Sequence, residues 1–101
     1  MKKILNGKMY NTETANCLAE YWNGRSSRDF RHLSESLYRK KNGEFFLYGE
    51  GGPLTKYKEP YGDMWGDGNA ITPLEADSAR EWAEKYMSTD EYIAVFGEPE
   101  E

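Results

Sequence analysis

The chain has 101 residues, which is about one domain, with 13 Lys or Arg against 18 Asp or Glu and a formal net charge of −5. No stretch approaches the roughly 18 apolar residues of a membrane span, and no apolar segment follows the lysines at the start, so we expect neither anchor nor leader. A single cysteine, Cys17, and a single histidine, His32, exclude an intrachain disulfide and leave a zinc site short of ligands.

The charges are divided unevenly along the chain. Residues 1–58 carry 11 Lys or Arg and six Asp or Glu, whereas residues 59–101 carry two and 12. If the fold keeps the two parts apart, the molecule has a basic and an acidic pole that attract partners of opposite charge.

The first elements are expected to be a hairpin and a helix. Residues 2–5 and 8–10 flank Asn6-Gly7, a dipeptide typical of a tight hairpin turn. Thr12 can cap a helix that ends at Asn23-Gly24 and whose apolar residues recur at helical spacing on one face: Ala15, Leu18, Ala19 and Trp22.

A second hairpin is expected in the middle of the chain. Residues 25–33 are polar and basic without a period, which indicates a loop. Residues 34–39 and 44–48 are rich in Tyr, Phe and Leu and surround a turn with another Asn-Gly pair, at Asn42-Gly43.

Residues 49–69 combine eight glycines and prolines with aromatic side chains. This composition predicts an ordered but irregular loop packed by Tyr57, Tyr61 and Trp65, with a short strand at residues 54–57. A loop of this length is a candidate functional surface.

Two helices are expected to end the domain. Thr72-Pro73-Leu74-Glu75 has the residues of a helix start, and Ala79, Trp82, Ala83 and Tyr86 form an apolar stripe. Ser88 to Glu91 repeats the capping pattern before a short helix that Gly97 ends, and residues 98–101 form an acidic tail. The predicted fold is therefore one α+β domain, residues 1–97, in which two hairpins form a small antiparallel sheet and three helices pack on one face.

No pattern in the sequence predicts catalysis, a metal site or a cofactor. Cys17 is interpreted as a partly buried, inert thiol in the first helix, and His32 as a hydrogen-bonded histidine without a nucleophile to activate. The glycines at 49, 51 and 52 lack the ending of a phosphate loop and are assigned to turns and close packing. Residues 63–74 resemble a calcium loop only in part, since the bidentate Glu is missing.

Two charged surfaces and the aromatic loop remain as candidate binding sites. The basic one mixes cations with aromatic rings, as phosphate-binding and base-stacking surfaces do, and consists of Arg25, Arg28, Arg31, Arg39, Lys40 and Lys41. The acidic one lies opposite the apolar stripe of the helix, continues into the last helix, and consists of Asp77, Glu81, Glu84, Asp90 and Glu91. For both charged surfaces the simpler interpretation, a solvated face or, for the basic one, an internal match for the acidic half, is favoured over a binding role.

Two segments, LYRKKNGEFFLYGEGGPLTKY (37–57) and ITPLEADSAREWAEKYMSTDEYIAVFGE (71–98), resemble small proteins of phages and integrated mobile elements of Gram-positive bacteria. The resemblance brings no catalytic residues. It implies a setting in the cytoplasm of a bacterial host, where such proteins are often inhibitors of host defence, anti-CRISPR proteins among them.

The leading hypothesis is a non-enzymatic inhibitor that blocks the nucleic-acid site of a defence nuclease with its acidic face or its aromatic loop. The first alternative is a nucleic-acid-binding accessory protein that uses residues 25–41. The second is a structural or regulatory module that forms homo-oligomers through Tyr57, Tyr61 and Trp65.

Overall fold

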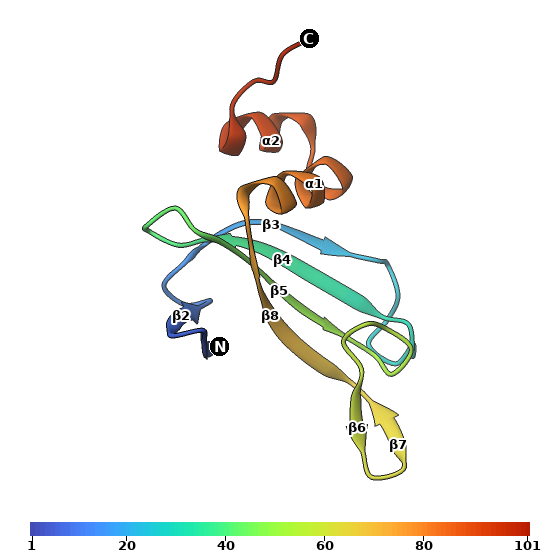
Figure 1. Ribbon diagram of the computed structural model, residues 1–101. Coiled ribbons are helices and arrows are strands. Elements are labelled where there is room, and N and C mark those ends of the chain that lie inside the picture. The colour runs from blue at the N-terminus through green and yellow to red at the C-terminus, as the bar shows by residue number, and fades with distance from the viewer.

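A computed structural model describes all of residues 1–101 and has a four-stranded antiparallel sheet at its centre. The strand order is β3 (Asn16–Trp22), β4 (Leu33–Arg39), β5 (Phe45–Gly51) and β8 (Gly68–Leu74). Helices α1 (Ala76–Tyr86) and α2 (Thr89–Phe96) lie on one side of the sheet, and the N-terminal segment lies on the other (Figure 1). The α+β class is confirmed, with two helices rather than the three expected.

Both hairpins predicted from Asn-Gly turns are present. β1 (Lys2–Leu5) pairs with β2 (Lys8–Asn11), and the turn residues Asn6 and Gly7 have the positive φ angles of 52° and 76° that this dipeptide tolerates. β4 pairs with β5 in register across the second turn. Only this second hairpin belongs to the main sheet, whereas β1 and β2 form a separate two-stranded sheet.

The helix expected from Thr12 to Trp22 is wrong, because residues 16–22 form strand β3 at an edge of the sheet. Its pairing with β4 shifts between Cys17 and Ala19, which makes Leu18 the extra residue of a β-bulge. The bulge breaks the alternation of the strand, so the consecutive residues Leu18 and Ala19 both pack against the helix-side core. Trp22, expected in the buried stripe, is 64% exposed.

The core lies on both faces of the sheet. On the helix side, Leu37 and Leu47 pack against Ala79 and Trp82, as the apolar stripe of α1 predicts. On the other side, Tyr10 of the N-terminal hairpin packs edge-on against Phe46, with ring centroids 5.5 Å apart, in a cluster with Ile71. Each face thus uses aromatic rings to bury a large area per residue.

The C-terminal helices are present, but α1 begins later than expected. Thr72 and Pro73 belong to strand β8, and the N-cap position is occupied by Glu75, whose side chain makes no capping bond. Pro73 is tolerated there because β8 is an edge strand. At α2 the capping box of Ser88 and Glu91 is confirmed, and Gly97 ends the helix with a φ of 84°.

The expected irregular loop at residues 49–69 is largely structured. β5 extends to Gly51, and β6 (Glu59–Tyr61) pairs with β7 (Met64–Gly66) in a third hairpin. The strand expected at residues 54–57 is absent. The β6–β7 hairpin projects beyond the sheet, at the end of the molecule opposite the helices (Figure 1).

Candidate functional site

The β6–β7 hairpin exposes three large side chains that the core does not use. Met64 is 73% exposed, Tyr61 60% and Trp65 55%. The hairpin is nevertheless held in shape, since the Tyr61 hydroxyl donates to the Asp67 carbonyl at 3.0 Å and the Lys58 ammonium lies 4.4 Å from the centroid of the Trp65 ring. An ordered, projecting group of exposed apolar side chains is typical of a surface that contacts a partner.

Tyr57, the third aromatic residue predicted in this surface, does not belong to it. Its side chain is buried, and its hydroxyl donates a short hydrogen bond to the carboxylate of Glu35 on β4. The ring lies directly over Gly49, where a side chain would overlap it. Tyr57 therefore attaches the loop to the sheet and is not part of the exposed aromatic surface.

Glu35 is the centre of a buried polar cluster that sequence reasoning missed. Only 3% exposed, it also accepts from the Trp82 indole of α1 at 3.0 Å and from the Lys56 ammonium at 2.8 Å. Burial alone would raise the pKa of Glu35, but the hydrogen bonds from Lys56, Tyr57 and Trp82 together hold it below its usual value. Burial and the neighbouring carboxylate raise the pKa of the Tyr57 hydroxyl, which remains a donor.

Both oxygens of Glu35 accept hydrogen bonds from side chains of the chain itself, Oε2 from Tyr57 and Lys56 and Oε1 from Trp82. The cluster connects β4, the loop before β6 and helix α1, which gives it a structural role. The signal in the sequence is the alternation Leu33, Glu35, Leu37, which places a carboxylate among residues that face the core.

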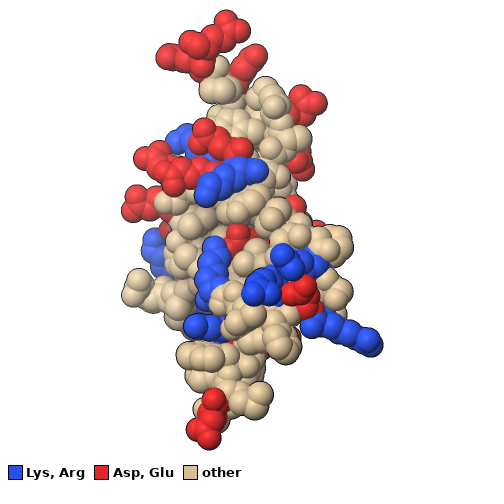
Figure 2. Space-filling model, turned by 90° about the vertical axis from the view of Figure 1, so that its right-hand side faces the viewer, with Lys and Arg blue, Asp and Glu red and all other residues tan.

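The predicted acidic residues lie together on the two helices, and all five are exposed. Asp77 pairs with Arg80 at 3.3 Å, and Glu91 is used in the capping box, while Glu81, Glu84 and Asp90 make no ion pair. Figure 2 shows carboxylates gathered over the helical end, with Lys and Arg across the middle of the molecule. The acidic pole is therefore present in space.

The predicted basic surface is divided in two. Arg25, Arg28 and Arg31 lie in the loop before β4, and Arg39, Lys40 and Lys41 lie at its other end. Six residue steps of a strand, at about 3.3 Å each, put roughly 20 Å between these groups. Two of these cations already have partners within the chain. Arg25 pairs with Asp29 at 3.1 Å, and the Lys40 ammonium lies 3.4 Å from Glu44 and 3.8 Å from the centroid of the Tyr10 ring.

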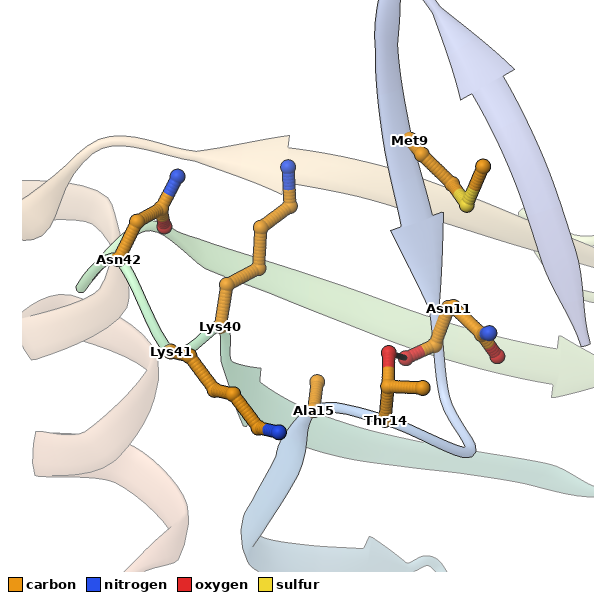
Figure 3. A pocket seen from close by; sticks show the side chains of 7 residues that line it. All are labelled: Met9, Asn11, Thr14, Ala15, Lys40, Lys41 and Asn42. Atoms are coloured by element: carbon orange, nitrogen blue, oxygen red, sulfur yellow. Dashed lines mark hydrogen bonds between the residues drawn. The ribbon is translucent and has the colours of Figure 1, made fainter.

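A hollow of about 340 Å³ separates the N-terminal hairpin from the β4–β5 turn (Figure 3). Met9 and Asn11 line it from β2, and the side chain of Lys41 reaches toward Ala15 from the opposite wall. Lys40 contributes its stem, while its ammonium is committed to Glu44 and Tyr10. With one uncommitted cation, the hollow lacks the converging donors of an anion site.

Residues considered for catalysis lie apart from one another. Cys17 is exposed on β3 rather than partly buried in a helix, and partial desolvation and the nearby Glu20 raise its pKa, which disfavours the reactive thiolate. His32 is hydrogen-bonded, as predicted, with Nδ1 2.7 Å from the Asp29 carbonyl. Gly49, Gly51 and Gly52 sit in close packing against neighbouring atoms, which confirms their structural interpretation.

No three His, Cys, Asp or Glu side chains lie close enough together to hold a metal ion. Neither helix has the length and apolar composition that a bilayer crossing needs. No family model matches the chain, and neither the curated proteins nor the solved structures yield a match. The projecting hairpin thus remains the surface with the strongest physical indication of a partner.

Proposed function

We propose that the protein is a non-enzymatic inhibitor that docks on a nucleic-acid-processing defence nuclease, in the manner of an anti-CRISPR protein, in the cytoplasm of a bacterial host. The observation that carries the binding function is the β6–β7 hairpin, which keeps Tyr61, Met64 and Trp65 exposed on an ordered, projecting support. Large aromatic and Met side chains are enriched at protein interfaces, and Trp is the most frequent hot-spot residue.

The target class is supported by two further points. The segments at residues 37–57 and 71–98 resemble small proteins of phages and mobile elements, among which inhibitors of host defence are frequent. The exposed carboxylates of α1 and α2 complement the basic channel of a nucleic-acid enzyme. The hairpin and the helical end lie at opposite ends of a molecule 49 Å long, so a partner that contacts both has to be large.

The alternative of direct nucleic-acid binding is less favoured, because β4 separates the arginine loop from Arg39, Lys40 and Lys41. A groove that follows the phosphate backbone of a nucleic acid needs its Lys and Arg side chains in one continuous row.

The test is cleavage of a labelled target duplex by purified CRISPR nucleases of Gram-positive hosts, with the protein titrated against each effector complex. Inhibition that is complete near one protein per nuclease is expected from a binder, whereas inactivation at a small fraction of that ratio would show turnover and refute the proposal. Absence of inhibition at every ratio for all of these nucleases would refute the target class.

Variants identify the surface. Trp65→Ala should raise the concentration needed for half-inhibition by about 30-fold, the size of a 2 kcal/mol hot spot. Ile4→Ala, at a residue 68% exposed on β1, is the matched control and should change little. The triple variant Asp77→Lys, Glu81→Lys and Glu84→Lys tests the acidic helices. If it abolishes inhibition while Trp65→Ala does not, the protein docks through the helices. A dimer in light scattering that Trp65→Ala dissociates would favour the homo-oligomeric module.

A further inference from the structure

A groove on the face of the sheet away from the helices, outside the cluster of Tyr10, Phe46 and Ile71, has the composition of a cation-binding site. It has a volume of about 460 Å³ and is lined from three strands. The serine-floored groove has Ser34 and Ser36 of β4 as its floor, Glu20 and Trp22 of β3 as one wall, and Tyr48 and Glu50 of β5 as the other.

The strand register explains why the face is hollow there. Glu20, Ser36 and Tyr48 form one row across the strands, and Trp22, Ser34 and Glu50 form the next. The middle residue of each row is a small serine between two large side chains. Strands lie about 4.8 Å apart, so the walls stand roughly 10 Å from each other, which is wide enough for one side chain to lie between them.

Each wall carries one carboxylate and one aromatic ring, in opposite order. Glu20 therefore faces Tyr48 across the floor, and Trp22 faces Glu50. A cation held in the groove has a carboxylate and an aromatic side chain on either side, residue types that combine ion pairing with cation–π attraction.

The groups are positioned by hydrogen bonds, one to the backbone outside the groove and two between groove residues. The Trp22 indole donates to the Arg25 carbonyl at 2.8 Å, which fixes the ring. Glu50 accepts from the hydroxyls of Ser34 and Tyr48, both at 3.3 Å. Tyr48 also packs against the Tyr10, Phe46 and Ile71 cluster, so this wall rests on the core.

The negative charge of the groove has no compensation within the chain. Neither Glu20 nor Glu50 forms a salt bridge, and no Lys or Arg lines the groove. This is unexpected for an ordinary solvated face, because residues 1–58 hold 11 Lys or Arg against six Asp or Glu. Two of those six carboxylates are thus placed beside aromatic rings with no internal cation.

We propose that the serine-floored groove binds the guanidinium group of an arginine side chain presented by an extended basic segment of a protein partner. Guanidinium is favoured over ammonium because its planar group stacks on the Trp22 ring while it donates to Glu50 in fork geometry. The groove is separate from the β6–β7 tip and does not depend on the function proposed above.

The probe is an acetylated, amidated Gly-Arg-Gly-Arg-Gly peptide, titrated into isotope-labelled protein and followed by amide NMR. Saturable shifts are expected at the Trp22 indole and at the backbone amides of Ser34, Ser36 and Glu50. The same peptide with citrulline in place of arginine, which keeps the shape and removes the charge, should shift nothing, and the lysine peptide should bind more weakly.

Removal of both charges by Glu20→Gln with Glu50→Gln should weaken binding roughly tenfold, and Trp22→Leu should also weaken it severalfold. The matched control is Glu13→Gln with Glu59→Gln, two exposed carboxylates outside the groove, which should leave the affinity unchanged. The single variants Glu20→Gln and Glu50→Gln serve if the double variant fails to fold.

Three results would overturn the proposal. Shifts confined to the backbone amides of α1 and α2 would show general attraction to the acidic pole. Equal affinity of the double variant and its control would remove the carboxylates from the site. Saturable binding of a neutral oligosaccharide such as maltotriose at these residues, without a response to the arginine peptide, would make the groove a carbohydrate site.

Discussion

The buried cluster around Glu35 predicts that removal of the Tyr57 hydroxyl group lowers the free energy of unfolding substantially. Tyr57→Phe removes the donor to a carboxylate that is 3% exposed and leaves Lys56 and Trp82 as its remaining partners. Hydrogen bonds to charged groups contribute about 1.5–3 kcal/mol. Set against a total stability of about 5–15 kcal/mol, this loss should lower the midpoint of thermal unfolding by at least roughly 6 °C.

The measurement is urea and thermal unfolding followed by circular dichroism at neutral pH. Tyr61→Phe is the matched control, because it removes the same atom from an exposed residue whose hydroxyl donates to a neutral carbonyl at 3.0 Å. This control should cost about 0.5 kcal/mol or less. If both variants unfold together with the unmodified protein, the Glu35 cluster does not stabilise the fold and the reasoning is refuted.

Three further predictions concern Glu35 itself, Gly49 beneath Tyr57, and the pair of Lys8 and Glu44. The pKa of Glu35 is depressed in the folded state, so the ionised carboxylate stabilises the fold above its unfolded pKa of about 4.3. This stabilisation is lost as the pH falls through the folded pKa. The stability difference between the protein and Glu35→Gln should therefore shrink on acidification, which urea titrations at several pH values measure. Gly49→Ala should destabilise the fold by about 1–3 kcal/mol or more in the same assay, because its Cβ would overlap the ring of Tyr57. A carboxyl NMR titration should find the pKa of Glu44 at about 2, held down first by the hydrogen bond from Lys8, and Lys8→Met should raise it toward its ordinary value; an unchanged value would exclude that contact.

The elements that sequence reasoning predicted correctly depend on local signals. Asn6 and Gly7 both adopt the positive φ angles of a tight hairpin turn, and Gly43 supplies the positive φ of 93° in the second turn. Ser88 with Glu91 starts α2 through bonds within one turn. The spacing of Ala79, Trp82 and Ala83 likewise predicts the buried face of α1.

The errors arise where a local signal fits two structures and a distant contact decides. The bulge at Leu18 gives an edge strand the spacing of a helix, and pairing with β4 makes it a strand. Pro73 suits a first helical turn and also an edge strand, and pairing with β5 selects the strand. Glu35 shows an unusual inward carboxylate in the sequence, but its partners Tyr57 and Trp82 are 22 and 47 residues away.

The same physics decides which candidate surfaces survive folding. A helix advances about 1.5 Å per residue and returns every third or fourth side chain to one face, so carboxylates close in the sequence, such as Asp77, Glu81 and Glu84, stay together on α1. A strand advances about 3.3 Å per residue, so β4 carries Arg39 roughly 20 Å from Arg31 and its loop. A sheet instead places side by side residues distant in the sequence, as the register of Trp22, Ser34 and Glu50 does across the face away from the helices. A sequence therefore reveals surfaces carried on one helix, whereas surfaces built across strands need the register.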